Sequence, residues 1–268
     1  MATKSKSDTD APPSYDAIQS KCQSSGPVFS RILRQKSTSN TILSCIRDLV
    51  TGPNFNPSSV DPIINSCASA LSAAKFSSLL QSRNIDGHSA IYWAIVNNRL
   101  EAVSASTKFI SKLSSGCRSD LRRACMVTSN HTLFTQLNLG RNVGPDDRPL
   151  RRSLGYSPDE IEVHEGDQAK NQFVALFRFR MCQRRLHITQ NITSAEFVAG
   201  GRIWWTRIHM GPEGRWRMTW GLSQHSLPAR PNAVVLIKAH MGKPGCATPP
   251  QELRLVSTRT NSSLVPKE

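Results

Sequence analysis

The sequence lacks the features that mark secreted and membrane proteins. No apolar run follows the lysines of the N-terminal MATKSKSDTD, so we expect no signal peptide. No segment approaches the roughly 18 apolar residues that a transmembrane helix needs. The seven cysteines are scattered and never form a CxxC pair, which argues against a disulfide framework and against a zinc ribbon. These absences predict a cytoplasmic or nuclear protein with no membrane span.

Recognisable catalytic motifs are also missing. The sequence has no G-x-S-x-G, no Gly-rich phosphate loop and no H-E-x-x-H. An acid–base or metal site can be imagined at His164 and Glu165, but a solvated loop is the simpler interpretation. We therefore expect a non-enzymatic protein with no catalytic residue, no cofactor and no metal site.

Negative charge is scarce. The chain has 19 acidic and 34 basic side chains, which gives a formal net charge of +15. Arginine is the commoner basic residue. Its aliphatic stem packs against other side chains, and its planar guanidinium group binds carboxylate or phosphate through paired hydrogen bonds. Such an excess favours anionic partners, such as nucleic acid or a membrane surface. A basic, soluble surface with no specific anion gives the same composition, so charge alone leaves both interpretations open.

Composition and apolar spacing divide the chain into five segments. Residues 1–27 are polar and cannot form a core, so we predict a disordered tail. Residues 28–145 show helical spacing, and the Gly- and Pro-rich residues 146–167 are predicted as a linker or long connection. Residues 168–256 switch to a period of two, which predicts an antiparallel β domain, and residues 257–268 form a flexible tail. The fold class is multidomain α + β, and we expect the helical part to fold as a separate unit.

Two helix boundaries are predicted in detail. An apolar stripe between Thr41 and Val50 indicates a helix that ends before Gly52 and Pro53. The next helix is expected to begin between Ser59 and Asp61-Pro62, because proline is tolerated in the first helical turn.

Alternating apolar residues predict the strands of the C-terminal domain. The runs are Phe173 to Phe179, Leu186 with Ile188, Ile203 to Met210, Trp216 to Leu222 and Ala233 to Ala239. Gly- and Pro-rich turns separate several of them, as in antiparallel sandwiches and barrels. We predict an antiparallel β-sandwich.

One segment of the helical part has the order of turn, cap and helix that is found in a known repeat. The residues of this motif are Asp86, Gly87, Ser89, Ile91, Tyr92 and Ala94. The run resembles the D-x-x-G-x-T-P-L-H-x-A pattern of ankyrin repeats, with Ser89 at the capping threonine and Ala90 at the proline. The resemblance implies a surface that binds another protein, and it implies no catalysis.

Weaker copies are expected on both sides, across about residues 60–140. Cys67-Ala68, Ala94-Ile95 and Ala124-Cys125 are predicted at comparable points of three helices. Each repeat buries its apolar face only against neighbours, so flanking copies are physically required. The spacing is shorter than the family's period of about 33 residues. Some other helical bundle is therefore the alternative.

The C-terminal part is faintly similar to MATH domains. Gly200-Gly201 precede Trp204-Trp205, and Gly211-Pro212-Glu213-Gly214 and Trp216 follow. MATH domains are β-sandwiches that bind short peptides of partner proteins. The similarity rests on a few residues, and no binding residue is carried over from it.

Arginine and tryptophan are interleaved in the same part. The candidate anion-binding residues are Arg178, Arg180, Arg184, Arg185, Arg202, Arg207, Trp204 and Trp205. On one face of a sheet, such residues would attract phosphates and stack on the bases of single-stranded nucleic acid. A solvent face of arginine over a tryptophan core is the alternative.

The N-terminal tail contains a short recognition pattern. Pro12, Pro13 and Tyr15 match the PPxY motif of WW-domain ligands, in which the prolines preset an extended helix and the tyrosine enters an aromatic groove. The predicted function is thus a non-enzymatic protein–protein interaction scaffold that uses an ankyrin-like surface. A WW-domain protein is one possible partner. The alternative is a nucleic-acid- or anion-binding protein that uses the Arg- and Trp-rich β domain.

Overall fold

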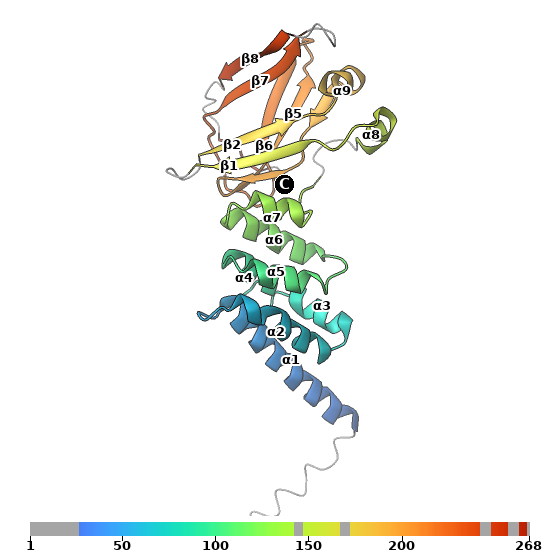
Figure 1. The fold of residues 1–268 in the computed structure, drawn as a ribbon, viewed down its shortest axis with the longest axis vertical. Helices are drawn as coiled ribbons and strands as arrows, with labels where there is room; N and C mark the ends of the chain where they lie inside the picture. Colours follow the sequence, from blue (N-terminus) through green and yellow to red (C-terminus); the bar gives the residue numbers. More distant parts are fainter. Residues whose placement is uncertain (1–26, 142–146, 167–171, 242–247, 257–262, 267–268) are drawn as a thin grey trace, which may run out of the picture.

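The structure, a computed structural model, describes residues 27–141, 147–166, 172–241, 248–256 and 263–266. Helices form an elongated stack, and antiparallel sheets lie at one end of it (Figure 1). The predicted mixture of helices and antiparallel sheets is confirmed. No helix within these ranges has the length and hydropathy of a membrane span. The PPxY motif at Pro12, Pro13 and Tyr15 lies outside the described residues.

Residues 27–141 fold into seven helices arranged in two rows. Their bounds are α1 Pro27–Thr51, α2 Pro57–Ser69, α3 Ala73–Gln81, α4 Ala90–Val96, α5 Leu100–Thr107, α6 Ser115–Val127 and α7 His131–Gln136. α4 lies between α1 and α6, and α2 packs beside α5 in the second row. α3 follows α2 and packs beside both α2 and α4.

Local signals explain where α1 ends and where α2 begins. α1 ends at Thr51, before Gly52 as expected. α2 begins at Pro57 rather than between Ser59 and Pro62, which corrects the prediction. The side chain of Asn56 accepts the N–H of Ser58 (3.1 Å), and Pro57 occupies the first turn, where its missing N–H has no intrahelical partner.

The turns that follow α4 and α6 have the same hydrogen-bonding pattern. The N–H of Arg99 donates to the carbonyl of Ala94 (2.7 Å), and the N–H of Asn130 donates to that of Cys125 (3.0 Å). The two helices therefore share one pattern, but it matches Ala94 with Cys125 and not, as predicted, with Ala124. The predicted equivalence of Cys67 with Ala94 is wrong, because Cys67 lies in α2, in the row opposite α4.

The strands form antiparallel sheets. Their bounds are β1 Glu160–Glu165, β2 Phe173–Arg178, β3 Asn191–Thr193, β4 Phe197–Ala199, β5 Arg202–Met210, β6 Trp216–Leu222, β7 Val234–Met241 and β8 Thr248–Val256. β1 pairs with β2, and β7 pairs with β8. β5 pairs with β6 on one edge and with β3 and β4 on the other. The predicted strands at β2, β5, β6 and β7 are confirmed.

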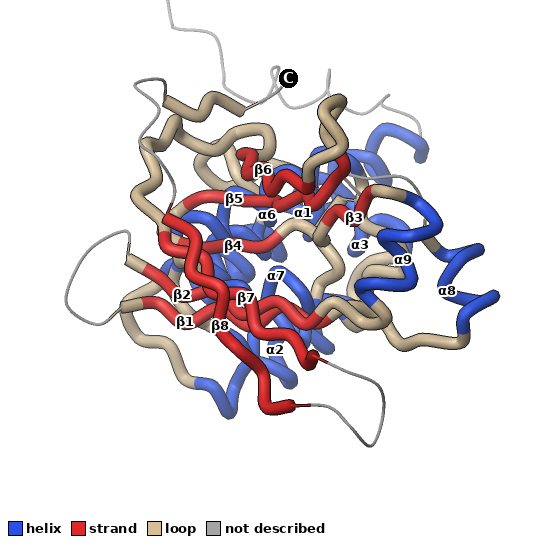
Figure 2. Tube along the Cα trace, turned by 90° about the horizontal axis from the view of Figure 1, so that it is seen from above, coloured by secondary structure: helices blue, strands red, loops and turns tan. Residues whose placement is uncertain are grey.

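Other expectations about this half differ from the structure. Leu186 and Ile188 lie in a helix, α9 (Cys182–Thr189), because two apolar residues at i, i+2 are too few to distinguish a strand from a helix. The predicted linker contains α8 (Arg148–Leu154) and strand β1. α8 and α9 lie side by side at one edge of the β half (Figures 1 and 2). In the predicted flexible tail, Leu264 pairs with Ala229 and packs against the core.

One apolar core runs from the helices into the β half. It includes Ile46 of α1, continues through Ala94 and Phe134, and reaches Val198 of β4 and Ile203 of β5. A second, smaller cluster is formed by Phe197, Ala199, Trp204 and Leu222. The larger core therefore crosses the boundary that was predicted near residue 145.

Candidate functional site

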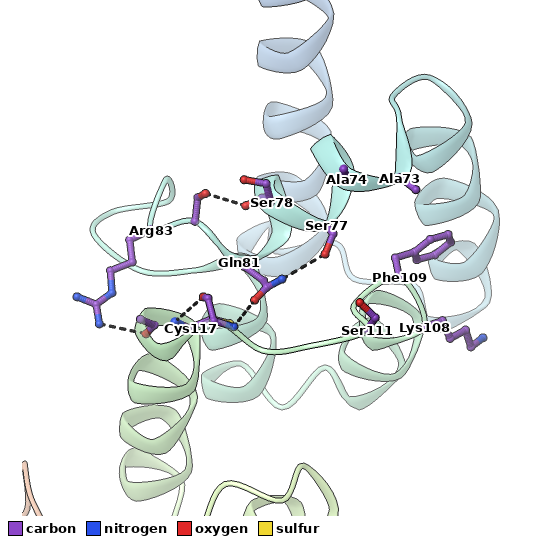
Figure 3. A pocket seen from close by; sticks show the side chains of 13 residues that line it. Ala73, Ala74, Ser77, Ser78, Gln81, Arg83, Lys108, Phe109, Ser111 and Cys117 are labelled. Atoms are coloured by element: carbon purple, nitrogen blue, oxygen red, sulfur yellow. Dashed lines mark hydrogen bonds between the residues drawn. The ribbon is translucent and has the colours of Figure 1, made fainter.

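A groove of about 1060 Å³ lies between α3 and the segment that leads from α5 into α6 (Figure 3). Its lining is Ala73, Ala74, Ser77, Ser78, Gln81, Ser82, Arg83, Lys108, Phe109, Ser111, Ser114, Gly116 and Cys117. Most of these side chains are small or carry a hydroxyl, and none is acidic. A bound chain could approach the backbone of α3 closely, because no long apolar side chain stands in its way along that helix.

Gln81 ties the two walls of the groove together. Its Oε1 accepts the N–H of Ser114 (2.7 Å), and its Nε2 donates to Oγ of Ser77 (3.2 Å). Ser114 in turn caps α6, since its Oγ accepts the N–H of Cys117 (3.2 Å). The last turn of α3 is thereby fixed to the first turn of α6 (Figure 3).

Cationic side chains stand at the two ends of the groove. At one end, Nη2 of Arg83 donates to the carbonyl of Gly116 (3.3 Å). At the other end, Nζ of Lys108 lies 3.0 Å from the carboxylate of Asp61, and both of these side chains are largely exposed. An exposed pair of this kind contributes little to stability. Lys108 can therefore exchange Asp61 for a carboxylate of a partner. The groove thus has positive charge at both ends and small polar walls between them.

The positive charge continues from Arg83 towards the β half. Oγ of Ser119, on α6, lies 3.5 Å from Nε2 of His225, in the segment after β6. Partial desolvation, followed by the charges of Arg123, Arg122, Arg141 and Arg83, lowers the pKa of His225. His225 therefore takes up a proton less readily than an isolated histidine, because its ring is partly desolvated and the arginines around it make the site positive.

The first residues of the ankyrin-like motif form a tight turn. Asp86 (φ 48°) and Gly87 (φ 79°) both have left-handed backbone conformations. The flanking Ile85 and His88 exchange two main-chain hydrogen bonds of 3.1 and 2.9 Å. Glycine suits the second position because it has no Cβ to clash. The turn predicted at Gly87 is present.

The remaining motif residues cap the N-terminus of α4 and form its buried face. Oγ of Ser89 accepts the N–H of Tyr92 (3.3 Å), as expected of an N-cap. Ile91 and Ala94 are each 1% exposed. These residues have a structural role, and the protein-binding surface that the resemblance implies stays a prediction.

Sequence reasoning missed Asp120, a buried carboxylate that links two helix pairs. Its side chain accepts the N–H and Oγ–H of Ser89 (2.7 and 2.9 Å) and lies 2.6 Å from Nδ1 of His88. Nε of Arg83 is 3.8 Å away. The acid is fully satisfied where it is, and it joins the start of α4 to α6. No local pattern pointed to it, because its partners lie more than 30 positions earlier in the chain.

The arginines predicted to bind anions are largely occupied by neighbouring groups. Arg178 forms ion pairs with Glu160 and Glu162, and Arg180 forms one with Glu160 (2.5 Å). Hydrogen bonds from both arginines hold the pKa of Glu160 below its usual value. These four side chains form a mixed surface on the hairpin of β1 and β2.

Arg185 is buried rather than available to a ligand. It lies on α9 and contacts the carboxylates of Asp159 (2.7 Å) and Asp147 (3.2 Å). Its guanidinium also stacks on the ring of Tyr156, at 5.0 Å from the centroid. Arg184, its neighbour, is exposed.

The remaining members of the predicted Arg–Trp set do not share one face. Arg202 donates to the carbonyls of Gly200, Leu227 and Pro228, whereas Nε of Arg207 donates to Asn191 (2.8 Å). Trp204 is 5% exposed and belongs to the core, while Trp205 is half-buried. The ring of Trp205 lies so close to Gly221 that a Cβ there would be 2.0 Å from it.

Two buried thiols of α6, of which Cys117 lines the groove, are not set up as nucleophiles. Burial raises the pKa of Cys117 to about 11 and that of Cys125 to about 12. Both thiols are therefore protonated at neutral pH. Within the described ranges, no group of three His, Cys, Asp or Glu side chains is placed to hold a metal ion.

Comparison with known proteins does not identify a relative. The chain matches no protein-family model, no curated protein and no solved structure.

Proposed function

We propose that this chain is a non-enzymatic interaction scaffold that binds another protein through its helical stack, and that the groove between α3 and α6 accepts an acidic segment of the partner. The observation that carries the proposal is the groove itself: small, hydroxyl-bearing walls, cations at both ends, and no acidic side chain among the described residues that line it. The formal net charge of +15 acts in the same direction, because it attracts acidic partners over a distance.

The ankyrin-like interpretation of the stack is part of this proposal. α4 with α5 and α6 with α7 are successive helix pairs whose turns share one hydrogen-bonding pattern, centred on Ala94 and Cys125. α1 with α2 is the first pair, and α3 is inserted before the second. Stacked pairs present a continuous surface to which every pair contributes, which suits the binding of an extended partner.

The β half completes the stack in this proposal. We assign it a sandwich arrangement, in which β2 faces the sheet of β4, β5 and β6 across the rings of Phe177 and Phe197, with centroids 5.2 Å apart. The apolar end of a repeat stack needs a cover, and Val198 and Ile203 supply apolar surface to the helical core.

The test is the binding of labelled peptides to the full chain, measured by fluorescence anisotropy. The probes are a glutamate-rich peptide with one phenylalanine and a lysine-rich peptide of the same length. We expect the acidic peptide to bind with a dissociation constant on the order of 10 µM, and the basic one not to bind. Equal binding of the two would contradict the proposal.

Matched variants locate the site. Arg83→Gln combined with Lys108→Gln removes two charges from the groove and should weaken binding about tenfold, whereas Arg152→Gln with Arg184→Gln removes two charges elsewhere and should change it less than about twofold. Ser78→Trp should block the groove, and Ser104→Trp on α5 is its control.

Single-stranded RNA that binds more tightly than the acidic peptide, with a log–log salt slope of about −0.7 per phosphate, would favour the nucleic-acid alternative.

A further inference from the structure

The β half contains a second cavity, of about 550 Å³, which is partly open to solvent and has many aromatic rings in its lining. The cavity lies between the hairpin of β1 and β2, the sheet of β5 and β6, and residues 228–234. Five aromatic rings line it: Phe173, Phe177, Phe197, Trp204 and Trp220. Its volume is within the range of about 300–1,000 Å³ that small-molecule sites occupy.

The rings surround the space instead of filling it. Phe177 lies 5.2 Å from Phe197 and 6.5 Å from Trp220, measured between ring centroids, and Phe173 lies 5.8 Å from Trp204. The small side chain of Ala175 faces the cavity between the two phenylalanines of β2. Rings that face an unfilled space lack dispersion contacts on that side, so a ligand that fills the space would gain them.

The ring lining is not a suitable place for water. A buried water needs two to four polar partners, and Nε1 of Trp204 is already used, since it donates to the carbonyl of Ala199 (2.9 Å). A planar apolar molecule would instead restore the missing contacts by stacking on the rings.

Charge decides what kind of planar molecule fits. Aromatic faces by themselves attract cations. The described residues of the lining, however, include Arg202 and Arg230 and no aspartate or glutamate, so a cation would be repelled. The guanidinium of Arg202 is held in place by the carbonyls of Gly200 (2.9 Å) and Leu227 (3.1 Å). Arg230 is exposed at the rim.

We propose that this aromatic cavity binds a small planar apolar anion, such as an aromatic carboxylate or sulfonate. Its ring stacks among Phe177, Phe197 and Trp220, and its acidic group faces Arg230 and Arg202 at the mouth. A guanidinium recognises a carboxylate or sulfonate through charge-assisted hydrogen bonds. The site lies in the β half and does not depend on the groove between α3 and α6.

Two fluorescent probes of nearly the same shape test the proposal on the full chain. The anion is 1-anilinonaphthalene-8-sulfonate, and its uncharged counterpart is N-phenyl-1-naphthylamine. Binding is followed by energy transfer from tryptophan, because Trp204 and Trp220 line the cavity. We expect one anion to bind per chain, with a dissociation constant on the order of 10 µM.

Cavity-filling variants show whether the probe enters the ring-lined space. Ala175→Trp should weaken the binding of both probes by at least about tenfold, because the new indole occupies their place. If Ala175→Trp does not melt cooperatively, Ala233→Trp fills the cavity from another wall. Ala70→Trp, at an exposed helix end, is the matched control and should leave binding unchanged. A folded filling variant that binds both probes as the wild type does would overturn the site.

The charge variant shows whether the ligand is an anion. Arg230→Ala should weaken the sulfonate probe about fivefold and leave the uncharged probe unchanged, because an exposed ion pair is worth only a modest amount. Arg184→Ala removes an exposed arginine outside the cavity and should affect neither probe. Equal effects of Arg230→Ala on both probes, or no effect on the sulfonate, would refute the proposed anionic ligand.

Discussion

Arg122 and Glu196 form a buried ion pair that joins α6 to the β half. Nη1 of Arg122 lies 2.5 Å from Oε2 of Glu196, Nη2 lies 3.1 Å from Oε1, and each side chain is 2% exposed. Ser223 and the N–H of Arg141 also donate to Glu196, and the carbonyl of Leu139 accepts from Arg122. Both Nη atoms of Arg122 and both carboxylate oxygens of Glu196 therefore have partners, which is the condition under which such a pair is tolerated in a core.

Removing one member of this pair should destabilise the protein strongly. Glu196→Gln leaves the guanidinium of Arg122 buried without its counter-charge, so we expect a loss of about 3–5 kcal/mol in the free energy of unfolding. Urea unfolding of the full chain measures this loss. Arg122→Met with Glu196→Met should cost less than the sum of the two single changes, because neither charge then remains unpaired. Arg178→Gln breaks an exposed pair and should cost less than about 1 kcal/mol. If Glu196→Gln costs as little as Arg178→Gln does, the burial of the pair is contradicted.

The two halves should unfold together. The larger core contains Phe134 of α7 as well as Val198 and Ile203 of the β half. Loss of the β half would expose that part of the core to water, so a fragment of residues 28–145 should be less stable than the same residues in the full chain. Far-ultraviolet circular dichroism and tryptophan fluorescence should give one coincident transition for the full chain. Two separated transitions, with a fragment as stable as the whole, would show that the halves are independent.

Stability should fall as the solution becomes mildly acidic, through His131. Burial lowers the pKa of His131. Its Nδ1 accepts the N–H of Val198 (3.4 Å), and its Nε2 lies 3.2 Å from the carbonyl of Ile161, so the folded state holds the neutral ring. Because the unfolded state takes up the proton first, this stability is complete above an unfolded pKa of about 6.5 and is lost as pH falls towards the folded pKa.

Urea midpoints at about pH 7.5 and about pH 5.5 measure this effect. His131→Gln should reduce the difference between the two midpoints. His225→Gln should reduce it less, because His225 is exposed, although its pKa is lowered in the same direction. The prediction is wrong if the pH dependence of His131→Gln equals that of the wild type.

A charge at Ala94 should disrupt the helix stack. Ala94 is 1% exposed in α4, which lies between α1 and α6. Ala94→Glu introduces a larger side chain and an unpaired charge there, so we expect a loss of several kcal/mol in the free energy of unfolding. Thermal melting of the variant checks this loss. Ala70→Glu, at an exposed helix end, should cost less than about 0.5 kcal/mol. A comparable, small cost at Ala94 would rule out its place in the core.

Features that depend on neighbouring residues were predictable from the sequence. The turn at Gly87, the cap at Ser89 and the buried Ala94 all lie within nine positions, and each follows from local steric and hydrogen-bonding preferences. Strand β5 was predictable because alternation over many residues leaves little ambiguity. Alternation over two apolar residues, Leu186 and Ile188, was not enough, and α9 was missed.

The sequence by itself determined the division into a helical and a β part, the boundaries at strong punctuation such as Gly52, and the excess of positive charge. Only the tertiary structure decided which arginines are free, because Arg185 and Arg122 meet carboxylates that lie 26 and 74 positions away. It also decided where α3 and α6 leave a groove and where five rings surround a cavity. Such placements depend on how distant elements pack, and neither apolar periodicity nor turn chemistry carries information over those separations.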